Sequence, residues 1–213
     1  MKTDDLIALL ARDATPVSRR GLPLRLAALT ALGALAAFVI LVPWLGVRND
    51  MAEALVGPVF WMKAIYTGGL GVAGFALVER LSRPGAKGRL GWALIGLFAV
   101  VILILAVMQI STTSPEGMRD AIMGTTWDRC PWRILVLAIP GLIALIWAMR
   151  GFAPTRPMLA GGAAGLLAGG VAATVYGLHC QETAAPFVAL WYTLGVALSV
   201  GAGALIGARA LRW

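Results

Sequence analysis

Residues 90–110 read LGWALIGLFAVVILILAVMQI and contain no Asp, Glu, Lys or Arg. A run of this length and apolarity matches the ~20 residues that a helix needs to cross the hydrocarbon core of a bilayer. Inside lipid the backbone finds no water, so an isolated segment can satisfy its own hydrogen bonds only as a helix. The stretch therefore predicts a transmembrane helix, and it decides the fold class of the chain.

Five further apolar runs accompany this one, and together the six cover residues 24–46, 58–77, 90–110, 134–149, 158–178 and 187–208. Of the 213 residues, 60% are hydrophobic and 13% are charged, whereas a soluble domain carries about 25% charged residues. We predict an all-α fold, a polytopic membrane helix bundle with six transmembrane helices embedded in the lipid bilayer. This composition excludes a soluble enzyme and a soluble nucleic-acid binder.

Basic residues lie mainly on one side of the predicted helices. Most of the 18 Lys and Arg residues fall in the N-terminal segment, in residues 80–89 and 150–156, and near the C-terminus. Because Lys and Arg collect in cytoplasmic loops, we expect both termini to be cytoplasmic. The same rule explains the net charge of +8 without any direct binding of nucleic acid. We divide the chain into a cytoplasmic tail, residues 1–23, and a six-helix transmembrane bundle, residues 24–213, and expect it in a bacterial inner membrane.

Groups suited to transport or catalysis are scarce. No Asp or Glu lies in the middle of a predicted helix, and ion or proton pathways depend on such intramembrane groups. Arg25, Lys63 and Glu79 lie near helix ends, where a long side chain reaches the interface. The sequence has one histidine and neither a phosphate-binding GxxxxGK[ST] loop nor an HExxH motif. We expect no enzyme activity. The competing classes are a membrane thiol-disulfide oxidoreductase, which usually requires two pairs of cysteines, and a small membrane transporter.

The only two cysteines, Cys130 and Cys180, lie just before the fourth predicted helix and just after the fifth. Both fall in polar loops on the non-cytoplasmic side, which is the oxidising side of a bacterial inner membrane. Three interpretations stay open: a structural disulfide, a redox or soft-metal sensor, and a thiol-disulfide exchanger. For a metal site, Cys130, Cys180 and His179 are the candidate ligands, with Glu182 as a possible addition, because thiolates favour soft metals.

Small residues recur at four-residue steps in the last two predicted helices. A stripe of this kind lets two helix backbones approach closely and gain van der Waals contact in a membrane. The stripe is either a tightly packed hairpin or an interface that slides during signalling. The candidate packing residues are Gly161, Gly165 and Gly169 in the fifth helix, and Gly195, Ser199 and Gly203 in the sixth.

The tail has the features of a short amphipathic helix. Thr3 is a good N-cap residue, and Asp4 and Asp5 oppose the positive end of the helix dipole. Such a short helix is marginal alone in water and must bury its apolar side, against a partner protein, the membrane surface or its own bundle. An acidic first turn disfavours the membrane surface, because anionic lipid attracts Lys and Arg. The apolar side consists of Leu6, Ile7, Leu9 and Leu10.

The chain resembles the NrsF family of bacterial inner-membrane anti-sigma factors. The resemblance rests on Thr-Asp-Asp-Leu-Ile-x-x-Leu at residues 3–10, Ala-x-Pro-Val at residues 14–17 leading into Arg19-Arg20, the six apolar runs and the two cysteines. It implies that the tail holds an extracytoplasmic-function sigma factor inactive at the membrane. It also implies release on a periplasmic heavy-metal or oxidative signal at Cys130 and Cys180.

The resemblance does not supply a map of the residues that contact the sigma factor. From the amphipathic pattern and the tail motif we assign that contact to Thr3, Asp4, Asp5, Leu6, Ile7, Leu9 and Leu10. No resident cofactor is expected, apart from a regulatory soft-metal ion.

Overall fold

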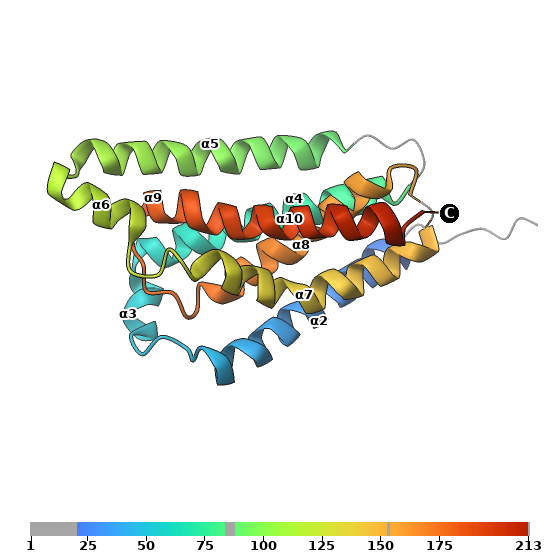
Figure 1. The fold of residues 1–213 in the computed structure, drawn as a ribbon, viewed down its shortest axis with the longest axis horizontal. Helices are drawn as coiled ribbons and strands as arrows, with labels where there is room; N and C mark the ends of the chain where they lie inside the picture. The colour runs from blue at the N-terminus through green and yellow to red at the C-terminus, as the bar shows by residue number, and fades with distance from the viewer. Residues whose placement is uncertain (1–20, 84–87, 153, 213) are drawn as a thin grey trace, which may run out of the picture.

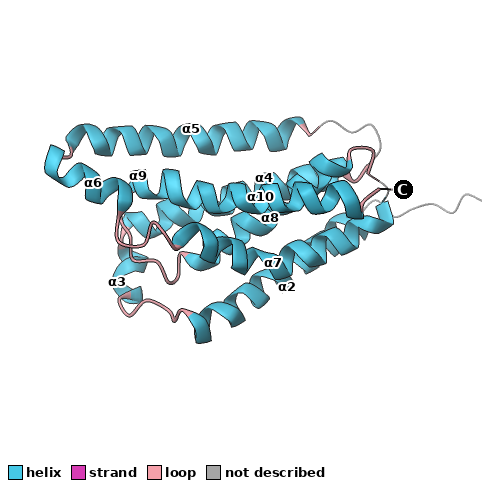
Figure 2. Cartoon of the chain, in the orientation of Figure 1, coloured by secondary structure: helices cyan, strands magenta, loops and turns pink. Residues whose placement is uncertain are grey.

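The computed structural model describes residues 21–83, 88–152 and 154–212, and within these ranges it contains helices and no strand (Figure 2). Six of the described helical segments are long and apolar enough to cross a membrane, which indicates a multi-pass membrane protein. The prediction of an all-helical fold with six helices of membrane-spanning length is confirmed for the described residues. The spanning helices are α2 (Gly21–Trp44), α4 (Pro58–Leu81), α5 (Arg89–Thr112), α7 (Cys130–Met149), α8 (Pro157–Tyr176) and α10 (Thr193–Ala210).

Shorter elements complete the described chain. The last span starts before α10, with one turn of helix, α9 (Ala185–Phe187), and a π-helical stretch, η2 (Val188–Tyr192). A 3-10 turn, η1 (Arg150–Phe152), extends α7. Two short helices, α3 (Met51–Val56) and α6 (Pro115–Met123), lie in the connections after α2 and after α5. α3, α6 and α9 lie at one end of the bundle, whereas α2 begins and α10 ends at the other (Figure 1).

The fourth spanning helix begins earlier than hydropathy predicted. Its first residue is Cys130, followed by Pro131, whereas the apolar run begins at residue 134. Proline is favoured in the first helical turn because the N–H that it lacks has no partner there in any case. The helix start is thus set by backbone geometry, and Cys130 belongs to the helix rather than to a polar loop.

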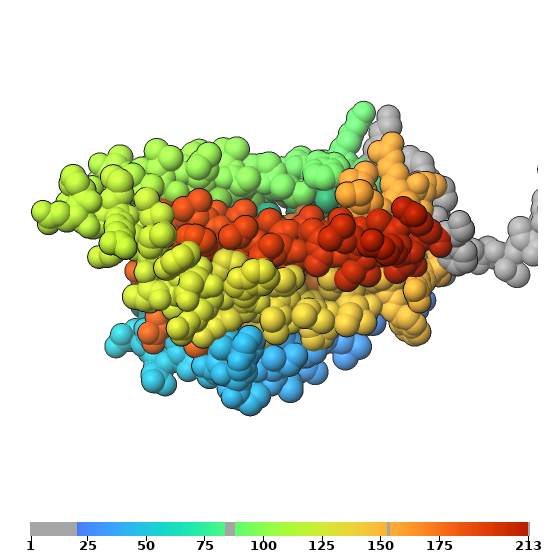
Figure 3. All heavy atoms as spheres, in the orientation of Figure 1, coloured from blue at the N-terminus to red at the C-terminus, as the bar shows by residue number. Residues whose placement is uncertain are grey.

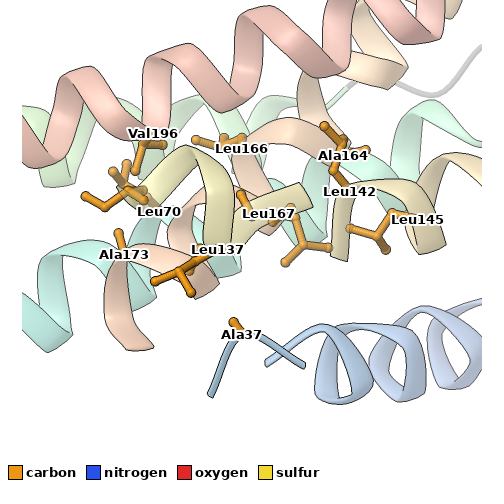
Figure 4. Close-up of a cluster of buried hydrophobic side chains, with 14 of the residues drawn as sticks. Ala37, Leu70, Leu137, Leu142, Leu145, Ala164, Leu166, Leu167, Ala173 and Val196 are labelled. Atoms are coloured by element: carbon orange, nitrogen blue, oxygen red, sulfur yellow. The ribbon is translucent and has the colours of Figure 1, made fainter. Parts of the chain in front are cut away.

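Helix α8 lies at the centre of the bundle and contacts α10, α4, α7 and α2. Along the apolar part of α8, 72% of the residues are buried within the protein, against 11% along the apolar part of α5. Helix α5 packs along one side of the bundle (Figures 1 and 3). In lipid the exposed apolar face of α5 is solvated by acyl chains. Leucine and alanine side chains of α7 and α8 meet those of the neighbouring helices in the core (Figure 4), among them Leu137, Leu142, Leu145, Ala164, Leu167 and Ala173.

The close packing of α8 against α10 depends on glycines, which have no side chain to keep the two backbones apart. A Cβ atom added at Gly161 would overlap the carbonyl oxygen of Gly203, and one added at Gly165 would overlap that of Ser199. At Gly169 an added Cβ would lie 2.8 Å from the Cβ of Ser199. The two backbones are therefore in direct contact along this stripe. Gly195 differs from the others, because it faces the side chain of Ile134 on α7 instead of α8.

Substituting Gly161 by valine is expected to destabilise the bundle by about 1–3 kcal/mol or more, since overpacking forces backbone shifts. The new Cβ would meet backbone atoms, the Gly203 oxygen and the Gly207 Cα, which cannot rotate away. Thermal unfolding in detergent micelles measures the effect. Gly201→Val is the matched control, because a Cβ at Gly201 meets nothing within 4 Å. Equal midpoints for the two variants would contradict the close approach of α8 and α10.

Candidate functional site

The two thiols lie at the end of the bundle opposite the start of α2 (Figure 1). Cys130 is the first residue of α7, and Cys180 lies in the connection between α8 and α9. Both are free thiols and are buried, with 0% and 3% of their surface exposed. They belong to the same buried cluster as Tyr176, Phe187 and Tyr192. The sequence placed them in polar loops, whereas the fold covers them, so a reagent reaches them only if the covering segment moves.

Lys63 of α4 holds the segment that carries Cys180. Its side chain is only 2% exposed, and its Nζ donates hydrogen bonds to the backbone oxygens of Cys180, at 3.0 Å, and Glu182, at 2.5 Å. Lys63 lies near the end of its helix, as expected, but its ammonium is covered by protein instead of exposed at the surface. The connection between α8 and α9 folds over the end of α4 and supplies carbonyl acceptors there, and a buried ammonium requires such acceptors.

A second cation reaches the same carbonyl. Arg48, in the connection between α2 and α3, donates from Nη1 to the Cys180 oxygen at 3.4 Å. Its Nε and Nη2 donate to the Asp50 carboxylate at 2.7 and 2.6 Å. This hydrogen bonding by Arg48 lowers the pKa of Asp50 from 3.8 to about 2. A lowered carboxyl pKa stabilises the folded state above the ordinary pKa of 3.8, and this stabilisation is lost as the pH falls through the lowered pKa of about 2. The Arg48–Asp50 ion pair therefore stays intact from neutral pH down to mildly acidic pH.

The other two predicted ligands are engaged elsewhere. His179 Nδ1 lies 3.0 Å from the Gly46 oxygen, and its Nε2 lies 3.3 Å from Arg133 Nη1. Since a carbonyl only accepts and an arginine only donates, the ring is assigned as the neutral Nδ1–H form. Within the described ranges there is no group of three or more His, Cys, Asp or Glu side chains placed to hold a metal ion.

Glu182 joins the segments that carry the two cysteines. Its Oε1 accepts hydrogen bonds from the backbone N–H of Thr125 at 2.8 Å, from the Thr125 hydroxyl at 2.7 Å and from the Thr126 hydroxyl at 3.2 Å. Thr125 and Thr126 lie a few residues before Cys130. The carboxylate therefore ties the connection after α8 to the turn that leads into α7.

A cavity of about 480 Å³ opens beside these segments. Tyr176, at its edge, is fully buried, and among the described residues its hydroxyl has no hydrogen-bond partner. Cys180 and Glu182 both line this cavity. It is lined by Leu45, Val47, Arg48, Asn49, Thr125, Thr126, Tyr176, His179, Cys180, Gln181 and Glu182.

The predicted sigma-contacting residues, within residues 3–10, lie outside the described residues. The described chain begins at Gly21, the first residue of α2. Sequence reasoning missed the roles of Lys63 and Arg48. A signal was present for Lys63, because it is a charged residue inside the apolar run of residues 58–77. For Arg48 the pattern of residues carries no such signal.

Comparison with known proteins gives consistent matches over the whole chain. The family described as NrsF, negative regulator of sigma F, matches residues 10–213. The protein named anti-sigma-F factor NrsF of Caulobacter vibrioides is 52% identical over 217 residues, covering 100% of this chain and 98% of that protein. The probable anti-sigma-F factor NrsF of Azospira oryzae is 41% identical over 213 residues, covering 100% of both chains. No solved structure matches this chain.

Proposed function

The chain belongs to the NrsF family of negative regulators of sigma F, and on this premise we propose that it is a membrane-anchored anti-sigma factor. Its N-terminal tail holds an extracytoplasmic-function sigma factor, and a signal at Cys130 and Cys180 releases it. One observation carries the proposal beyond the family: the thiols lie at the end of the bundle opposite the start of α2 (Figure 1), and the tail directly precedes α2 in the sequence. A signal and its output can thus be separated by the membrane.

The distribution of charge supports an orientation with the tail in the cytoplasm. Arg25 lies in the first turns of α2, and Arg80 and Arg209 lie in the last turns of α4 and α10. All three belong to the end of the bundle where the tail enters. Because cytoplasmic ends are enriched in Lys and Arg, this end faces the cytoplasm of a bacterial inner membrane and the thiols face the periplasm.

The signal acts on the dithiol itself, by one of two routes. A soft metal ion is bound by two thiolates, and two protons are released. Alternatively, a two-electron oxidant such as hydrogen peroxide takes two electrons and two protons from the thiols, so that an S–S bond forms, the O–O bond breaks and two waters leave. Both thiols are free, and the Glu182 carboxylate ties together the segments that carry them, which supports both routes. Neither route makes the protein an enzyme, which agrees with relatives named as regulators.

Transmission to the tail needs an element with two arrangements, because coupling between distant sites is a difference in free energy between two states. Cys130 begins α7, and the segment after Cys180 continues through the π-helical stretch Val188–Tyr192 into α10. Both helices pack on α8, and glycines bring the backbones of α8 and α10 into direct contact. A bond between the two thiols, direct or through a metal ion, shifts the positions of α7 and α10 relative to α8. Π-helical stretches occur frequently at functional sites.

Co-purification tests the core of this proposal. The full chain, extracted from the membrane in mild detergent, is expected to retain a sigma factor of the same cell, identified by mass spectrometry. A variant that lacks residues 2–20 is expected to lose more than nine-tenths of it, because one turn or two of amphipathic helix supplies the contact. Equal recovery with both proteins would show that the tail does not hold the sigma factor.

A further inference from the structure

We propose that Lys63 is a positioning residue of the sensor, which holds Cys180 in place and keeps the thiols covered until the signal arrives. The inference rests on the proposed function, and it assigns a role to a residue on a different helix from either cysteine. The ammonium binds two backbone oxygens in one turn of chain, those of Cys180 and Glu182. The Lys63 side chain therefore holds the segment between α8 and α9 against the end of α4.

The charge of Lys63 has no carboxylate partner. Among the described residues, no Asp or Glu oxygen lies within 4.0 Å of its Nζ, and Asp50 is engaged with Arg48. A buried ammonium without acceptors is very unfavourable. With the segment closed, Lys63 makes two charge-assisted hydrogen bonds to backbone carbonyls, and lifting the segment away from α4 breaks both at once. A neutral apolar residue makes neither bond and would hold the segment less firmly.

The position of Cys180 depends on the same contact. Its backbone oxygen accepts from Lys63 at 3.0 Å and from Arg48 at 3.4 Å, so the residue that carries the thiol is fixed through its own carbonyl. The Glu182 carboxylate ties the segment to Thr125 and Thr126, close before Cys130. A bond between the two sulfurs, direct or through a metal, pulls on this backbone. Lys63 is the group through which that displacement reaches α4.

Helix α4 in turn approaches the central helix, backbone to backbone, at two of its glycines. A Cβ added at Gly74 would lie 2.5 Å from the backbone nitrogen of Leu167, and one added at Gly170 would lie 2.5 Å from that of Gly71. Close-packed helices of this kind transmit a displacement instead of absorbing it. The contacts of Lys63 thus connect the sensor to the same helix, α8, that α7 and α10 contact.

The test measures how fast a charged maleimide modifies the thiols in the full chain, purified and held in lipid nanodiscs at one pH. Lys63→Met keeps the length of the side chain but removes its charge and its donors. We expect the thiols of this variant to be modified about tenfold faster or more, because the closed segment loses one or two hydrogen bonds to a charged group and opens more often. Lys63→Arg keeps charge and donors and is expected to restore a rate within about threefold of the original.

Two further variants keep the test decisive. Arg80→Met removes a charge from the exposed opposite end of the same helix and is expected to leave the rate unchanged. If Lys63→Met fails to fold, Lys63→Gln replaces it and is expected to give an intermediate increase. An unchanged rate in the neutral variants, or no rescue by arginine, overturns the inference. No sigma factor is present in this assay, so its failure is distinct from failure of the proposed function.

Discussion

Replacing both Leu6 and Leu10 by aspartate is expected to release the sigma factor and to leave its target genes active without any stress. The two leucines lie on the apolar side of the predicted tail helix. Burying a leucine contributes about 1.5–3 kcal/mol, so losing both weakens the complex by about a hundredfold or more. A reporter gene under a promoter of the sigma factor measures the effect, with the amount of protein in the membrane determined by immunoblot.

The control for this variant adds the same charges to the opposite side of the helix. Successive residues of a helix are rotated by about 100°, so Ala8 and Arg12 face away from Leu6 and Leu10. Ala8→Asp/Arg12→Asp is expected to keep the reporter repressed. If both double variants release the sigma factor equally, charge and not the apolar side decides binding. If neither does, the tail residues do not contact the sigma factor.

Replacing both cysteines by serine is expected to abolish induction of the same reporter by soft metals and by oxidants, while repression without stress is kept. Serine cannot form an S–S bond and is a poor ligand for soft metals. The reporter is measured before and after cadmium or hydrogen peroxide is added. Induction should fall to the level of the unstressed culture, because Cys130 and Cys180 are the only thiols of the chain.

Because both cysteines are buried, a second double variant is needed to separate loss of the thiols from loss of stability. A serine hydroxyl at a buried position lacks a partner and destabilises the fold, whereas Cys130→Ala/Cys180→Ala removes the thiols without adding a polar group. Both double variants should repress normally and fail to respond. A normal response in either one refutes the sensor role of the thiols. Intact-mass spectrometry of the stressed wild-type chain separates the routes, since a disulfide is two hydrogen atoms lighter and a bound metal adds mass.

Several features of the fold follow from short segments of sequence. Residues 90–110 carry no charge, and lipid leaves such a segment no structure but a helix. Helix formation and membrane crossing depend on bonds within one segment, so hydropathy predicts them. The four-residue spacing of Gly161 and Gly165 likewise places both on one face of α8, and that face meets α10. Gly195 shares the spacing but faces α7, because spacing defines a face and not the neighbour of that face.

The environment of the thiols depends on contacts between segments far apart in the chain. Cys130 and Cys180 looked exposed because polar residues surround them in sequence, yet both are buried. Lys63 looked free to reach water, yet it binds the backbone of residues more than a hundred positions away. The sequence by itself determined the six long apolar helices and the presence of two cysteines, but not the short helices α3 and α6. Only the tertiary structure decided which side chain covers, holds and isolates those thiols, because that depends on which connection folds over which helix end.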